Sequence, residues 1–194
     1  MATPASSKLR AWYVLLLYGG LASVVLGNFF RQRSDDEFPT FTLIYPGALA
    51  IASGVVCGCI LLYRSWRCVA SHATQFDTKK RPLDPAAAVA LTILPVVNLV
   101  GMFFSLGLLP RELNWLASAT GVKARAPKDV GMAAAVVALC AMIPVAGKLF
   151  AVVAVLILIP VVIVSSSRVA DSIEDRLLPG RVILRRAGDI QEGP

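Results

Sequence analysis

The sequence predicts an all-α fold, a polytopic bundle of transmembrane helices with about four crossings, and three observations support this. Apolar residues make up 57% of the 194 residues and charged residues only 16%, against about 45–50% and about 25% in soluble domains. The apolar residues form long blocks without charge, near or above the roughly 20 residues that a helix needs to cross the hydrocarbon. The connections are short, so we expect one transmembrane domain over residues 11–167.

The first two apolar blocks have the length of plain spans. The first, residues 11–30, follows a short N-terminus, residues 1–10. It is longer than the roughly 7–15 apolar residues of a signal-peptide core, so we expect it to be retained. The second block, residues 38–63, has no charged side chain. Aromatic and basic residues typical of an anchor at the membrane surface close it: Tyr63, Arg64, Trp66 and Arg67.

The third apolar block, residues 85–110, is broken. Pro95 removes a backbone hydrogen bond and favours a kink, and Asn98 is the most polar side chain well inside an apolar block. We expect Asn98 to satisfy backbone groups that Pro95 frees, and the alternative is a pore or polar intramembrane site at these two residues. The stretch 111–118, with Trp115, predicts a short amphipathic helix at the membrane surface.

The last apolar region, residues 130–167, is too long for one span of about 17–25 residues. Pro144, Gly147 and Lys148 lie near its middle. A single span would place the Lys148 charge deep in the bilayer at a cost of several kcal/mol, so a hairpin that turns at these residues is favoured. The polar tail, residues 168–194, is expected to be cytoplasmic and to start as a helix.

Basic residues collect in cytoplasmic loops and therefore indicate orientation. If the third block dips into the membrane and returns, sixteen of the 19 basic residues lie inside and three outside. Four crossings with residues 130–167 as one element give twelve against six, and five simple crossings give eight against eleven. Both better arrangements place the two termini in the cytoplasm, with an even number of crossings.

Small residues recur every four positions in the first two spans, a spacing that lets helix backbones approach closely. Packing inside one subunit is the simpler interpretation, and a homo-oligomer seam is the alternative. The residues are Gly19, Ser23 and Gly27 in the first span and Ala50, Gly54 and Gly58 in the second.

The remaining polar residues argue against catalysis. The apolar blocks contain no Asp, Glu or His, the single histidine, His72, lies in a basic connector, and there is no P-loop or nucleophile elbow. The four cysteines lack the paired spacing of a metal site, so no metal, cofactor or nucleic-acid partner is expected. The net charge of +7 instead favours anionic lipid headgroups as partners. The expected contacts are Arg64, Arg67, Lys79, Lys80 and Arg81.

The stretch from Tyr63 to Ser118 resembles a bacterial membrane-protein family known as domain of unknown function 4328. The resemblance rests on an aromatic and basic segment, a P-x-x-N-L core and an R-[ED]-[IL] segment that ends in Ala-Ser. The matching residues are Tyr63, Arg64, Trp66, Arg67, Pro95, Asn98, Leu99, Arg111, Glu112, Leu113, Ala117 and Ser118. The gap from Asn98 to Arg111 looks about one helical turn longer than in the family. The resemblance implies a bacterial inner (cytoplasmic) membrane and no particular activity.

The leading functional hypothesis is a non-enzymatic membrane protein that acts by assembly, as a homo-oligomer or as an accessory subunit of a membrane complex. The small-residue stripes and the near absence of soluble mass motivate it. The first alternative is a small passive channel or transporter whose path lies at the broken third block. A membrane-embedded enzyme is a distant alternative.

Overall fold

The structure is a computed structural model, and it describes residues 4–33, 40–76, 81–93, 103–140 and 153–177. Every regular element in these ranges is helical, so the all-α class is confirmed for this part of the chain. Three helical segments are long and apolar enough to cross a membrane: Ser6–Arg31, Phe41–Phe76 and Leu156–Leu177. The first two correspond to the first and second apolar blocks. The third overlaps the last apolar block over residues 156–167 and continues for ten residues into the stretch predicted as the polar tail. Three such helices agree with a multi-pass membrane protein.

The chain forms two compact units, residues 4–61 and the chain from residue 62 onward. The first unit contains α1 (Pro4–Arg31), the π-helix η1 (Thr40–Ile44) and the beginning of α2 (Tyr45–Phe76). The long helix α2 continues from this unit into the second one. Its 32 residues span about 48 Å at about 1.5 Å per residue, more than the roughly 30 Å of bilayer hydrocarbon.

In the first unit, α1 packs against η1 and the beginning of α2 as an antiparallel hairpin. The closest approach joins two glycines: a Cβ on Gly20 would lie 2.6 Å from the carbonyl oxygen of Gly47, and a Cβ on Gly47 would lie 2.8 Å from that of Gly20. Gly54 meets the backbone of Leu17 in the same seam. Because the missing side chains let the backbones touch, small residues determine how closely these two spans pack.

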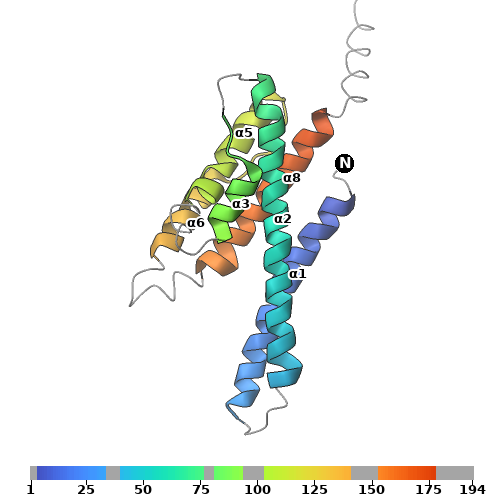
Figure 1. Ribbon diagram of the computed structural model, residues 1–194, viewed down its shortest axis with the longest axis vertical. Coiled ribbons are helices and arrows are strands. Elements are labelled where there is room, and N and C mark those ends of the chain that lie inside the picture. The colour runs from blue at the N-terminus through green and yellow to red at the C-terminus, as the bar shows by residue number, and fades with distance from the viewer. Residues whose placement is uncertain (1–3, 34–39, 77–80, 94–102, 141–152, 178–194) are drawn as a thin grey trace, which may run out of the picture. The chain divides into compact units, whose positions relative to one another are not determined.

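The second unit is a bundle of shorter helices around the second part of α2 (Figure 1). It comprises α3 (Pro85–Ile93), the π-helix η2 (Phe103–Gly107), α5 (Leu109–Ala119), α6 (Lys128–Cys140), the π-helix η3 (Ala154–Leu158) and α8 (Ile159–Leu177). Helix α5 packs against α8, and α6 contacts η2, η3 and α8. The core consists of apolar side chains, with Leu106, Leu113, Leu116, Val162 and Ile173 among its fully buried members.

Local sequence signals explain where these shorter helices begin and end. The carboxylate of Asp84 accepts a hydrogen bond from the Ala87 amide at 2.9 Å, and Pro85 follows it, so α3 starts with an N-cap and a first-turn proline. Helix α5 ends in a Schellman motif: Gly121 has φ +69°, and the Val122 amide donates to the Ala117 carbonyl at 2.8 Å.

Helix α5 contains the segment predicted to lie at the membrane surface, and its environment differs from that prediction. Leu109, Leu113 and Leu116 on its apolar face are fully buried, and the helix contacts α6, η2 and α8. A surface-bound amphipathic helix needs its apolar face free to enter lipid. The apolar stripe of α5 instead belongs to the core of the bundle.

Candidate functional site

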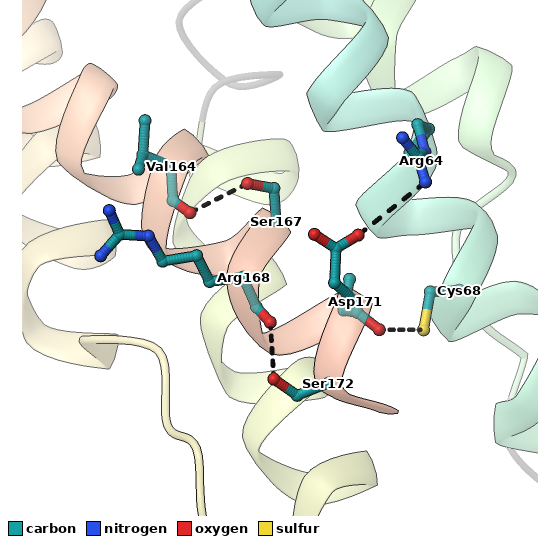
Figure 2. A network of polar contacts seen from close by, with 8 residues as sticks. Arg64, Cys68, Val164, Ser167, Arg168, Asp171 and Ser172 are labelled. Carbon is teal, nitrogen blue, oxygen red and sulfur yellow. Dashed lines mark hydrogen bonds and ion pairs between the residues drawn. The ribbon is translucent and has the colours of Figure 1, made fainter. Parts of the chain in front are cut away.

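A contact between two charged side chains in the second unit joins α2 to α8. The guanidinium of Arg64 lies 3.8 Å from the carboxylate of Asp171 (Figure 2). Among the described residues, Asp171 is the only charged side chain that is buried, with 8% of its surface exposed. The side chain of Arg64 keeps 35% exposure, so it connects a buried carboxylate to the solvent or headgroup region.

A second α2 side chain meets α8 one helical turn further along. The Cys68 thiol donates to the carbonyl oxygen of Ala170 at 3.8 Å, and Figure 2 shows both contacts on facing sides of the two helices. Cys68 is almost completely buried. Ser167 and Ser172 on α8 donate back to carbonyls of their own helix, those of Val164 and Arg168.

A third contact ties α2 to the third apolar block. The indole N–H of Trp66 donates to the carbonyl oxygen of Ser105 at 3.1 Å, and Trp66 is only 2% exposed. The hydroxyls of Thr92 and Ser105 lie 2.9 Å apart, and the Thr92 hydroxyl donates to the Ala88 carbonyl at 2.8 Å. Trp66 therefore lies in the core, whereas the sequence suggested an anchor at the membrane surface.

The predicted small-residue positions are divided between the inside of the hairpin and its outer face. A Cβ on Gly27 would meet Ile44, one on Gly58 would meet Tyr13, and the Ser23 hydroxyl donates to the Leu43 carbonyl at 2.8 Å. These residues, together with Gly54, pack within one subunit. A Cβ on Gly19, in contrast, would have no described atom within 4 Å. Ala50 is half-buried.

The residues predicted to contact anionic lipid differ in their surroundings. Arg67 and Arg81 are exposed, whereas the guanidinium of Arg64 is engaged by Asp171. Lys79 and Lys80 lie outside the described residues, and so do Pro95 and Asn98, the predicted polar site of the third block.

Several residues that make close contacts in the structure are not among those predicted from the sequence. Gly20 directly follows Gly19, so either glycine could be the one that faces a neighbouring helix. Only the contact with Gly47 shows that Gly20 is the residue at the α1–α2 seam. Asp171 lies beyond the last apolar block, in the stretch predicted to be a polar tail. Asp171 is three residues after Arg168, which is less than one turn of an α-helix. This spacing was the only signal in the sequence that Asp171 lies close to the end of the span.

The described contacts fix helices relative to one another. No group of three or more His, Cys, Asp or Glu side chains among the described residues is placed to hold a metal ion. Comparison with protein-family models, with curated proteins and with solved structures finds no match for the chain. The resemblance of residues 63–118 to domain of unknown function 4328 stays a prediction.

Proposed function

We propose that this chain is a multi-pass membrane protein of a bacterial cytoplasmic membrane that acts by assembly and not by catalysis. The observation that carries the proposal is how little of the first two spans the chain itself covers. Only 22% of the most apolar window of Ser6–Arg31 and 17% of that of Phe41–Phe76 are buried, against 50% for Leu156–Leu177. These two spans offer large surfaces to lipid or to other subunits.

The outer face of α1 supports a contact with a second copy of the chain. Gly19 lies on this face between the exposed side chains of Leu15 and Leu26, which are one and two turns away. A glycine between large side chains leaves a notch in which another helix backbone can approach closely. The other face of α1 is already occupied by the Gly20–Gly47 contact.

Native mass spectrometry of the full chain after gentle solubilisation tests the assembly. We expect a mass of more than one chain, and we expect Gly19→Leu to shift it toward the monomer. Val25→Leu is the matched control, because Val25 is also exposed on α1 but lies about 120° away from Gly19 around the helix. A strictly monomeric wild-type chain without co-purifying subunits would overturn the proposal, and a Gly19→Leu variant that assembles normally would remove α1 as the seam.

The proposed topology places both termini in the cytoplasm, and the third block enters the membrane and returns to the same side. Thr92 and Ser105 carry hydroxyls 2.9 Å apart, although thirteen residues of continuous helix would separate them by about 20 Å. The contacts of α6 with η3 and α8 support a second return within the last apolar region. Exposed Arg67 and Arg81 on the cytoplasmic side then suit anionic lipid headgroups.

A double variant, Thr92→Cys with Ser105→Cys, tests the return of the third block in a full-length chain whose four native cysteines have been replaced by alanine. Because the two hydroxyls touch, oxidation should close a disulfide between the two introduced thiols. Thr92→Cys paired with Ser118→Cys, which places the second thiol on the exposed side of α5, should give none. Failure of the first pair to cross-link would contradict the return.

The second candidate function is a passive channel or transporter with its path at the third block. The observation that favours it is the contact of two hydroxyls, those of Thr92 and Ser105, within the third apolar block. Solute flux into liposomes that contain the chain provides the test, with Asn98→Leu and Ser105→Ala as variants. Flux that neither variant changes would reject a path at this block.

A further inference from the structure

A five-residue π-helix followed closely by a proline occurs three times in the described chain. Thr40–Ile44 precedes Pro46, Phe103–Gly107 precedes Pro110, and Ala154–Leu158 precedes Pro160. In each case the proline is the second residue of the α-helix that follows. We call each π-helix together with its proline a proline joint.

The chemistry of proline accounts for the shape of these joints. Proline has no N–H to donate, and its ring clashes with the carbonyl four residues earlier, so the preceding turn widens. Carbonyl groups in that turn lose their partner along the helix. In a membrane, such groups need another donor, because no water is present to supply one.

At the middle joint, the missing donor comes from a different helix. The π-type partner of the Ser105 carbonyl, five residues ahead, would be the nitrogen of Pro110, which carries no hydrogen. The indole N–H of Trp66 on α2 donates to this carbonyl instead, at 3.1 Å, and both residues are buried. The indole thus supplies a donor to a carbonyl whose π-type partner is a proline nitrogen.

A glycine makes room for a neighbouring helix at the same joint. The Leu106 carbonyl is four residues before Pro110, and a Cβ on Gly131 of α6 would lie 2.9 Å from its oxygen. The first joint has only part of this arrangement. The Ser23 hydroxyl donates to the Leu43 carbonyl, but this carbonyl is three residues before Pro46 and is not the one that loses its donor there. A Cβ on Gly27 would lie 2.6 Å from a side-chain carbon of Ile44. Among the described residues, a donor from another helix on a carbonyl that faces a proline is therefore seen at the middle joint.

We propose that the proline joints are hinges of the membrane hairpins, and that Trp66 fixes the middle hinge by supplying the hydrogen bond that Pro110 cannot make. While the hydrogen bond between Trp66 and Ser105 is present, η2, in the second half of the third block, is attached to α2. When it is lost, η2 can bend independently of α5. This device concerns one chain and does not depend on the proposed assembly.

A double-mutant cycle with hydrogen exchange of the full chain in lipid nanodiscs tests the proposal. Trp66→Phe keeps an aromatic ring and removes the donor, and it should raise the exchange rates of the η2 amides about tenfold, as expected for a buried carbonyl left unpaired. The amides of α6 and α8 should be unaffected. Trp12→Phe is the matched control, because Trp12 is exposed on α1.

Pro110→Ala supplies the second arm of the cycle. Alanine restores an N–H at position 110, which can pair with the freed carbonyls of Ser105 or Leu106, so the new amide should itself be protected from exchange. In this background Trp66→Phe should change the η2 rates less than about threefold. An equal effect of Trp66→Phe in both backgrounds, unchanged η2 rates in the single variant, or a uniform rise across α6 and α8 would each overturn the proposal. Rapid exchange of the restored amide at position 110 would do the same.

Discussion

Arg64 and Asp171 form an ion pair of 3.8 Å between α2 and the end of α8, and the two members of the pair differ in exposure. Asp171 is buried, whereas Arg64 retains contact with the surroundings through a third of its side chain. Loss of the arginine therefore removes a positive charge from beside a buried carboxylate, but loss of the carboxylate leaves an arginine that can still reach water or headgroups.

This asymmetry predicts the order of two single variants. Arg64→Gln should lower the free energy of unfolding by about 1–3 kcal/mol, and Asp171→Asn should cost less. Thermal unfolding in detergent provides the measurement, with Arg67→Gln as the control, because Arg67 is exposed on the same helix. An Asp171→Asn variant that is less stable than Arg64→Gln would contradict this interpretation of the pair.

The two adjacent glycines of α1 make a matched comparison of packing in the first unit. A Cβ on Gly20 meets the carbonyl oxygen of Gly47 and the backbone of Ile51, whereas a Cβ on Gly19 meets no described atom. Gly20→Ala should therefore destabilise the hairpin by about 1–3 kcal/mol through overpacking. Gly19→Ala should be neutral or stabilising by up to about 1 kcal/mol, because alanine favours the helix.

Unfolding of monomeric protein in detergent, followed by circular dichroism, distinguishes the two variants. Equal stabilities for Gly19→Ala and Gly20→Ala would mean that α1 does not contact α2 through the Gly20 side.

A side-chain amide fixes the connection between α5 and α6. Asn114 accepts a hydrogen bond from the Ala126 amide at 2.7 Å and donates to the Ala126 carbonyl at 2.8 Å. Asn114→Ala loses both bonds, and Asn114→Asp loses only the donor. Tryptic cleavage after Lys123 and Arg125 should therefore accelerate in the order wild type, Asn114→Asp, Asn114→Ala, with about tenfold between the ends of the series. Identical cleavage rates for all three proteins would show that the connection is held by other contacts.

Sequence reasoning was most successful where the bilayer imposes a simple rule. Length and lack of charge were enough to predict the three long apolar helices, because only a helix satisfies its own backbone in hydrocarbon. Composition was not sufficient for side chains that suit both the membrane surface and the protein core. Trp66 beside Arg67 is typical of an anchor at the membrane surface. In the structure, however, its indole N–H donates to a carbonyl thirty-nine residues away in the sequence.

The π-helices were beyond prediction for a related reason. Pro46 and Pro110 lie near the beginning and at the end of apolar blocks, and a proline in such a place is equally compatible with a helix start or a widened turn. The choice depends on whether a neighbouring helix supplies a donor such as Trp66. Such partners are set by tertiary packing and leave no local pattern in the chain.

Thiol labelling from each side of the membrane tests the proposed topology. Single cysteines at Arg81 and Lys123, in a chain without native cysteines, lie before and after the third block, and a cysteine at Arg33 lies beyond α1. With oriented membrane vesicles and an impermeant maleimide, we expect positions 81 and 123 to be labelled from the same, cytoplasmic side and position 33 from the opposite side. Labelling of positions 81 and 123 from opposite sides would show that the third block crosses the membrane, and would contradict the account.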